Sequence, residues 1–147
     1  MPSVFDVAAY LLNKHGPMTA MKLQKLIYYS QAWSLVWDEA PIFAEPIEAW
    51  ANGPVVRALY EAHRGCFMLQ RRDLDEGNAR ALNGDQKKTL DAVLRFYGDK
   101  SSQFLSDLTH REDPWRNARD GLRPGERGSS VISHAALAEY YGSLQKD

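Results

Sequence analysis

The segment from Thr19 to about Trp37 is the part of this sequence that most restricts the possible folds. Its apolar residues recur with a helical period, and a helix of this length spans roughly 27 Å. One face carries Leu23, Leu26, Ile27, Ser30, Trp33, Ser34 and Trp37, and a second stripe carries Gln24, Tyr28, Gln31 and Leu35. A helix that is apolar or amphipathic nearly all round is expected to be buried by several neighbours. We therefore predict a central helix around which the rest of the fold is organised.

Further helices are predicted from capping residues and apolar spacing along the rest of the chain. They start at Ser3, Asn52-Gly53-Pro54, Asp85, Ser101, Pro114 and Ser133. Short extended segments are expected at 42–43 and 47–51, and an irregular stretch or a short strand pair at 65–84. Residues 121–130 hold three glycines and one proline, which predicts a loop. We expect residues 1–147 to form one domain, mainly α (α+β), with a small antiparallel sheet or hairpin beside the long central helix.

Composition excludes several classes of protein before any motif is considered. A chain of 147 residues with 44% hydrophobic and 11% aromatic residues is long enough to bury a real core. Its formal net charge of −1 gives no general attraction to nucleic acid or to an anionic membrane. The single cysteine, Cys66, excludes an intramolecular disulfide and is expected to be a partly buried apolar residue. No signal peptide and no bilayer-spanning run is recognised, so a cytoplasmic location is expected.

Two blocks in the first half of the chain are, taken together, specific enough to indicate a family. The first reads Lys22-Leu-Gln-Lys-Leu-Ile-Tyr-Tyr-Ser-Gln-Ala-Trp33, and the second reads Glu45-Pro-Ile-Glu-Ala-Trp50 followed by Gly53-Pro54-Val55-Val56. Further matching positions are Leu105, Leu108-Thr109-His110, Pro114-Trp115, Ala118-Arg119, Ile132 and Tyr140-Tyr141. In these residues the sequence resembles the SocA-like antitoxin family of prokaryotic and phage-associated proteins. Its domain is called Panacea, and it includes GepA-type proteins.

The resemblance implies a mostly helical domain with a small sheet. It also implies an antitoxin that neutralises a cognate toxin protein by direct protein–protein binding. Some members of the family work as adaptors that deliver the bound toxin to a protease, so a protease such as an ATP-dependent Clp-type machine is an alternative partner. Members often carry an additional DNA-binding domain, for which we expect this chain to have no room. Nucleic acid and membrane are therefore not expected partners.

The candidate partner-binding residues are Gln24, Tyr28, Gln31, Trp50, Trp115, Arg116 and Arg119. Tryptophan often dominates protein interfaces. Trp33 lies on the apolar face and is expected to pack in the core, whereas Trp50 fits either role. The stripe of Gln24, Tyr28 and Gln31 fits a buried hydrogen-bond network or an exposed contact surface. The network is preferred, because polar groups on a buried helix need hydrogen-bond partners.

Charged residues offer a second kind of contact. The arginines at positions 111, 116, 119, 123 and 127 alternate with acidic residues, which is typical of a solvated, self-paired surface. As a functional alternative, they offer arginine contacts to an acidic patch on a toxin. Lys22 and Lys25 are expected at a solvated end of the central helix, although Lys25 beside Tyr29 is also suited to holding a carboxylate.

The sequence contains little that indicates catalysis. The four histidines do not have the spacing of a metal site, and neither a phosphate-binding loop nor a Gly-x-Ser-x-Gly motif is found. His110 with Glu112 or Asp113 is the one acid–base arrangement, and it keeps a small hydrolase-like enzyme as an alternative of another class. The preferred interpretation is a binding protein without enzymatic activity, cofactor or metal.

Overall fold

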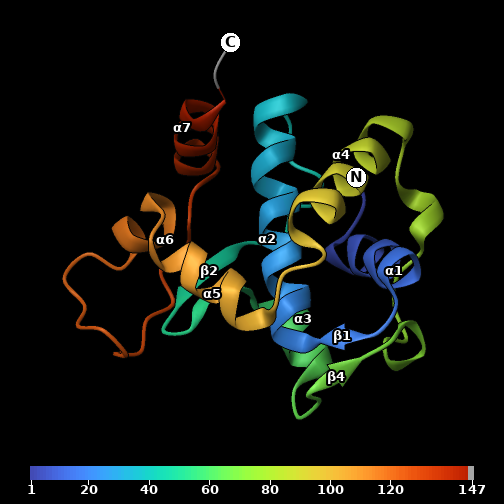
Figure 1. Ribbon diagram of the computed structural model, residues 1–147, viewed down its shortest axis with the longest axis horizontal. Coiled ribbons are helices and arrows are strands. Elements are labelled where there is room, and N and C mark those ends of the chain that lie inside the picture. Colours follow the sequence, from blue (N-terminus) through green and yellow to red (C-terminus); the bar gives the residue numbers. More distant parts are fainter. Residues whose placement is uncertain (146–147) are drawn as a thin grey trace.

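The computed structural model describes residues 1–145 (Figure 1). The helices in that range are α1 (Val4–His15), α2 (Ala20–Trp37), α3 (Arg57–His63), α4 (Gly84–Tyr97), α5 (Ser102–His110), α6 (Asp113–Ala118) and α7 (His134–Leu144), with two short 3₁₀ helices, η1 (Arg71–Asp73) and η2 (Ala79–Ala81). The strands are β1 (Met18–Thr19), β2 (Ile47–Trp50), β3 (Gly53–Val56) and β4 (Met68–Leu69). Strand β1 pairs with β4, and β2 pairs with β3, both antiparallel. The predicted fold class, mainly α with a small antiparallel sheet, is confirmed.

Helix α2 is the centre of the fold, as predicted from its sequence. In Figure 1 it runs through the middle of the molecule, with α7 on one side and α4 on the other, and both of these helices contact it. Leu23, Leu26, Ile27, Tyr29 and Ala32 have no exposed surface. Burial on several faces of one helix explains why its apolar pattern is not confined to one stripe. None of the helices in residues 1–145 is long and apolar enough to cross a membrane.

Helix starts follow the caps expected from the sequence. At α1 the Ser3 hydroxyl accepts a hydrogen bond from the Asp6 backbone N–H, and the Asp6 carboxylate accepts one from the Ser3 N–H, which completes a capping box. Thr19, Ser101 and Ser133 each accept a hydrogen bond from the backbone N–H three residues later. These side chains pair N–H groups that a first helical turn leaves without a partner. The predicted starts of α1, α2, α5 and α7 are therefore correct.

The prediction of a helix starting at Asn52-Gly53-Pro54 is wrong. Residues Gly53–Val56 form strand β3, which pairs with β2 in the register Ile47 with Val56 and Trp50 with Gly53, and α3 begins only at Arg57. Gly53 has a φ of 127°, which is not a helical conformation and is one that glycine adopts readily. The two valines that follow Pro54 favour a strand. The Gly-Pro pair therefore forms a hairpin and not a helix cap.

Two other expectations need correction. Residues 42–43, expected to be extended, belong to no strand, because their backbone groups pair with a side chain of α2 instead of with another strand. The stretch 65–84 is mostly irregular, which is one of the two alternatives expected, and its short strand β4 pairs with β1 and not within the stretch itself. Cys66 lies at the start of this stretch and is exposed, not partly buried as expected.

Candidate functional site

Gln24 and Gln31, on the polar stripe of α2, form buried hydrogen bonds to backbone groups of two other segments, in the way that a neighbouring strand would. The Gln24 side chain accepts a hydrogen bond from the Val56 N–H at 2.9 Å and donates one to the Val56 carbonyl at 3.3 Å. The Gln31 side chain accepts from the Ile42 N–H and donates to the Phe43 carbonyl, both at 2.8 Å. Each amide thus pairs backbone groups that would otherwise be buried without a partner. Because Gln24 and Gln31 are buried, they offer no surface to a partner in this conformation.

Lys25 departs most from the sequence prediction. It was expected near a solvated helix end, but its side chain has no exposed surface, and its Nζ donates to the Pro54 carbonyl at 3.3 Å. Burial lowers the pKa of the Lys25 amine from 10.5 to about 7. The amine lies directly beneath the hairpin, since a Cβ added to Gly53 would stand 2.5 Å from Lys25 Cε. Lys25 therefore ties α2 to the β2–β3 turn and does not hold a carboxylate.

Tyr28 belongs to a second buried cluster, which joins α2 to α6 and α7. The hydroxyls of Tyr29 and Tyr141 donate to Glu112 Oε1 at 2.7 and 2.8 Å, and the Tyr28 hydroxyl lies 2.9 Å from that of Tyr141. Burial raises the pKa of the Glu112 carboxyl, although hydrogen bonds from Tyr29 and Tyr141 act in the opposite direction. Tyr28 is buried like Gln24 and Gln31, so all three polar residues of the predicted stripe lie inside the protein.

His110 and Glu112 do not form an acid–base pair in the described structure. Glu112 Oε1 is occupied by two tyrosine hydroxyls, whereas the His110 ring stacks on Trp115 with 4.0 Å between the ring centroids. His110 Nε2 is buried and has no hydrogen-bond partner among the described residues. Asp113, the other candidate, lies 3.9 Å from the guanidinium of Arg116. The geometry gives the enzyme alternative no support.

Three predicted contact residues lie near the hairpin and differ in exposure. Arg119 is buried and donates to the carbonyls of Ala49 and Glu126, so it braces the loop between α6 and α7 against β2. Trp115 is partly exposed and donates from its indole to the Trp50 carbonyl at 2.8 Å. Arg116 is exposed. Of these three, only Trp115 and Arg116 present side-chain surface to a partner.

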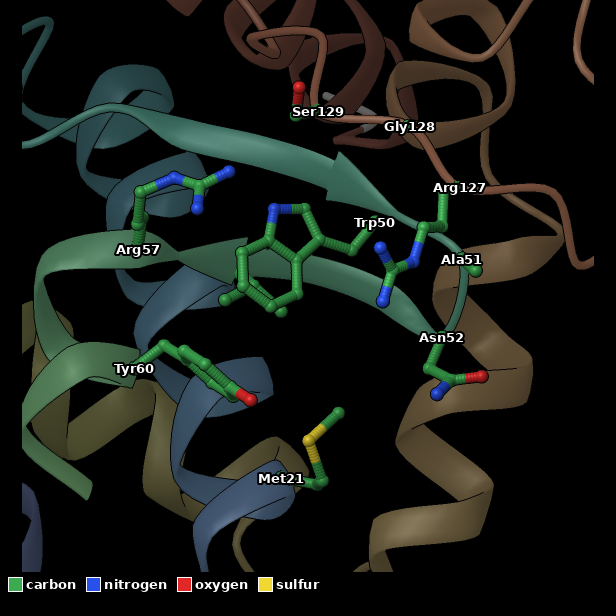
Figure 2. A pocket seen from close by; sticks show the side chains of 10 residues that line it. Met21, Trp50, Ala51, Asn52, Arg57, Tyr60, Arg127, Gly128 and Ser129 are labelled. Carbon is green, nitrogen blue, oxygen red and sulfur yellow. The ribbon is translucent and has the colours of Figure 1, made fainter. Parts of the chain in front are cut away.

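A pocket of about 630 Å³ opens beside the hairpin. We call it the hairpin pocket, and it is lined by Met21, Trp50, Ala51, Asn52, Val55, Arg57, Tyr60, Arg127, Gly128 and Ser129. Figure 2 shows the Trp50 ring at its centre, with Arg57 on one side and Arg127 on the other. The pocket therefore combines the first turn of α2, the hairpin, α3 and the loop that follows α6.

The Trp50 ring is held in place by its neighbours. Its indole N–H donates to Glu48 Oε1 at 2.9 Å, and Arg57 bonds the two oxygens of the same carboxylate at 2.8 and 3.1 Å. The Arg57 guanidinium lies over the Trp50 ring, 5.1 Å from its centroid. Burial acts to raise the pKa of Glu48, but the hydrogen bonds from Arg57 and Trp50 outweigh it and lower that pKa. The carboxylate thus stays charged and fixes both side chains.

A second hollow, of about 530 Å³, lies near the other end of α2. We call it the aromatic groove, and it is lined by Trp33, Trp37, Phe96, Tyr97, Lys100, Phe104, Leu108, Leu144 and Gln145. Phe96 is 66% exposed and Phe104 is 44% exposed. Trp33 forms its floor, stacked on Trp37 at 5.0 Å and donating to the Tyr97 hydroxyl at 2.9 Å. Trp33 therefore packs against the core, as predicted, and also borders this groove.

Sequence analysis did not identify most of these surface residues. Of the seven candidate partner-binding residues only Trp50 lines the hairpin pocket, joined there by Arg127 from the arginine-rich segment, and none lines the aromatic groove. Phe96 does carry a signal, because it falls outside the apolar face of its helix that contains Leu90, Val93, Leu94 and Tyr97. A single exposed aromatic residue is ordinary, and it indicates a contact surface only where further exposed apolar residues lie beside it, as they do around this groove.

The fold is a small helical domain in which the polar residues Gln24, Lys25 and Gln31 of the central helix pair with backbone groups inside the protein. Comparison with known families matches residues 23–116, more than half of the chain, to the family described as "Antitoxin SocA-like, Panacea domain". The protein belongs to this family, as its sequence blocks had indicated. The family is one of antitoxins, which supports a role in a toxin–antitoxin system. No curated protein and no solved structure gives a significant match.

Proposed function

We propose that this protein neutralises a cognate protein toxin by binding it directly, with the aromatic groove as the docking surface. The observation that carries the proposal is the exposure of Phe96, Phe104, Trp37 and Leu144 around one hollow. Contiguous exposed apolar surface on a small domain is typical of a protein-binding site. Aromatic side chains that a partner covers completely supply most of the affinity at such sites.

The shape of the groove favours an amphipathic helix of the toxin. Its lining comes from α2, α4, α5, the turn after α4 and the end of α7, so its walls are mainly helical. A helix that places an apolar face into a hydrophobic groove is a common mode of recognition. The groove is the centre of the proposed contact, since a stable interface covers about 800 Å² on each partner. Nanomolar neutralisation requires about −12 kcal/mol of binding free energy.

The proposed mechanism needs no catalysis. Direct binding uses exposed side chains, and His110 and Glu112 are engaged with Trp115 and with two tyrosines. The toxin is inactivated because the bound antitoxin covers its active site or holds it in an inactive form.

Growth rescue tests the proposal. The product of the neighbouring reading frame is expressed with the wild-type protein or with the double variant Phe96→Ala/Phe104→Ala. Because Phe96 is 66% exposed and Phe104 44% exposed, the variant is expected to fold normally. Its affinity for the toxin should fall about 30-fold or more, since truncation of a hot-spot residue costs about 2 kcal/mol.

Phe67→Ala is the matched control, because Phe67 is 77% exposed but lies outside the aromatic groove. It should rescue growth as well as the wild type does. Full rescue by the double variant, at equal protein levels, would show that the groove is not the docking surface. A neighbouring product that is harmless when expressed alone would remove the basis of the proposal. Toxin abundance, measured in the same cultures, should stay unchanged if binding alone neutralises it.

A further inference from the structure

The hairpin pocket is a second recognition site with a different chemistry. We propose that it receives one acidic side chain of the toxin together with the apolar side chain next to it. This inference rests on the proposed function, because the toxin supplies the segment that is bound. It does not depend on the aromatic groove, which is built on the opposite end of α2: Met21 in the first turn lines the pocket, and Trp37 in the last turn lines the groove.

The charges around the pocket leave one positive charge without compensation. Arg57 and Arg127 are the charged residues that line it. Glu48 compensates Arg57, which donates two hydrogen bonds to its carboxylate. Among the described residues, no carboxylate lies within ion-pair distance of Arg127. Glu61 also acts electrostatically on Arg57, but its ion pair is with Arg64, at 3.6 Å. Arg127 therefore remains the lining cation without a carboxylate partner among the described residues, and one aspartate or glutamate side chain would supply that partner.

The remaining polar groups of the lining favour an acceptor as ligand. Besides the arginines, the Asn52 amide, the Ser129 hydroxyl and the Tyr60 hydroxyl can all donate hydrogen bonds. Figure 2 shows Asn52 and Arg127 at the same end of the pocket, where the hairpin turns. A carboxylate accepts only and has about four lone-pair positions, so it matches a pocket rich in donors.

The apolar part of the pocket is the reason why the proposed ligand includes an apolar side chain next to the acidic one. The Trp50 and Tyr60 rings meet edge to face, with 4.9 Å between their centroids, and Met21 is 36% exposed beside them. Glu48 and Arg57 hold the Trp50 ring, so the part of the ring that Arg57 does not cover is available without reorganisation. An apolar side chain covers this surface while the neighbouring carboxylate reaches Arg127. Tryptophan, tyrosine and arginine are also the residues most enriched at interface hot spots.

A phosphate group fits this pocket less well than a carboxylate does. A phosphate monoester carries about −1.5 to −2 charges at neutral pH, whereas the pocket has one uncompensated cation. An arginine side chain often binds phosphate through two parallel hydrogen bonds. In Arg57 the Nε and one terminal nitrogen already donate to Glu48. A nucleotide is therefore the competing ligand that the experiment has to exclude.

Nuclear magnetic resonance titration of the full chain, labelled with nitrogen-15, tests the inference without the toxin. The probes are the capped peptides acetyl-Leu-Asp-Leu-amide and acetyl-Leu-Asn-Leu-amide, and the reporter is the Trp50 indole resonance. The Asp peptide should shift this resonance with about two- to fivefold higher affinity than the Asn peptide, as expected for one exposed charge pair. Raising the salt concentration should reduce that difference.

Arg127→Gln should lower the affinity for the Asp peptide about two- to fivefold and leave the affinity for the Asn peptide unchanged. Arg123→Gln is the control, because Arg123 lies on the same loop, is 91% exposed and pairs with Glu126 instead. Equal binding of the two peptides, no shift with either, or a shift of Trp50 by adenosine monophosphate alone would each overturn the inference. Failure of growth rescue with intact peptide binding would instead refute the proposed toxin neutralisation and leave the pocket chemistry standing.

Discussion

Replacing Lys25 by methionine should remove a pH dependence of stability that this one buried amine creates. In the folded protein its pKa is about 7, because burial disfavours the charged form, whereas its ordinary value is 10.5. Between these two values the unfolded chain binds the proton more strongly than the folded chain does. The free energy of unfolding therefore rises with pH across this window, because proton binding stabilises the unfolded chain and weakens as the pH rises.

The size of the effect follows from the two pKa values. Integration of proton binding from pH 7 to pH 9 gives an increase in unfolding free energy of about 2 kcal/mol for the wild-type protein. The Lys25→Met variant has no group to titrate at this site, so that part of the slope should vanish. Loss of the hydrogen bond to the Pro54 carbonyl shifts the absolute stability of the variant equally at every pH and leaves the comparison of slopes intact.

Urea unfolding at pH 7, 8 and 9, followed by circular dichroism, measures both slopes. Lys88→Met is the matched control, because Lys88 is exposed and its replacement should preserve the wild-type slope. Parallel pH profiles for the wild type and Lys25→Met would refute the reasoning, because they would mean that the Lys25 amine keeps its ordinary pKa in the folded state.

Two further predictions concern the hairpin and the enzyme alternative. Gly53→Ala should lower the free energy of unfolding, measured by urea unfolding, by about 1–3 kcal/mol, because φ at this position is 127° and the new Cβ would meet Lys25 Cε at 2.5 Å. Gly142→Ala is the control, because Gly142 is a helical position with open space around it and should not destabilise comparably. His110→Gln should retain full growth rescue at wild-type protein levels, and complete loss of rescue in a folded variant would revive an acid–base role for His110.

The helices were predictable because their signals are local. Ser3, Thr19, Ser101 and Ser133 each lie three residues before the N–H group that they cap, so the sequence shows both partners together. The apolar pattern of α2 likewise predicts burial on several sides, whatever the neighbouring elements are.

The hairpin was mispredicted because its strand character depends on distant residues. Gly53 and Pro54 are common at helix starts, and the sequence alone does not reveal the φ of 127° at Gly53. Strand β3 is stabilised by Gln24 and Lys25, which lie about 30 residues earlier and pair the backbone groups of Val56 and Pro54. A local reading of the sequence cannot detect such long-range side-chain partners.

The same limit applies to the candidate site. For Gln24, Tyr28 and Gln31 the sequence left open a buried network, which was preferred, or a contact surface, and their partners are backbone groups and another tyrosine inside the fold, which confirms the network. The aromatic groove, in contrast, assembles from segments between residues 33 and 145 that approach one another only after folding. Phe96 lies outside the apolar face of its own helix, but the sequence does not show that Phe104, Trp37 and Leu144 gather beside it.

Helix α2 belongs to the core through its middle turns and contributes to two surfaces through its two ends. Its middle turns use Gln24, Lys25 and Gln31 to pair backbone groups of the segments around it, which leaves no polar side chain there for a partner. Its two ends reach the surface, with Met21 at one and Trp37 at the other, separated by about 24 Å of helix. A circular interface of about 800 Å² is roughly 32 Å across. The spacing along α2 is therefore compatible with one toxin contacting both sites, while the rigid helix between them fixes their separation.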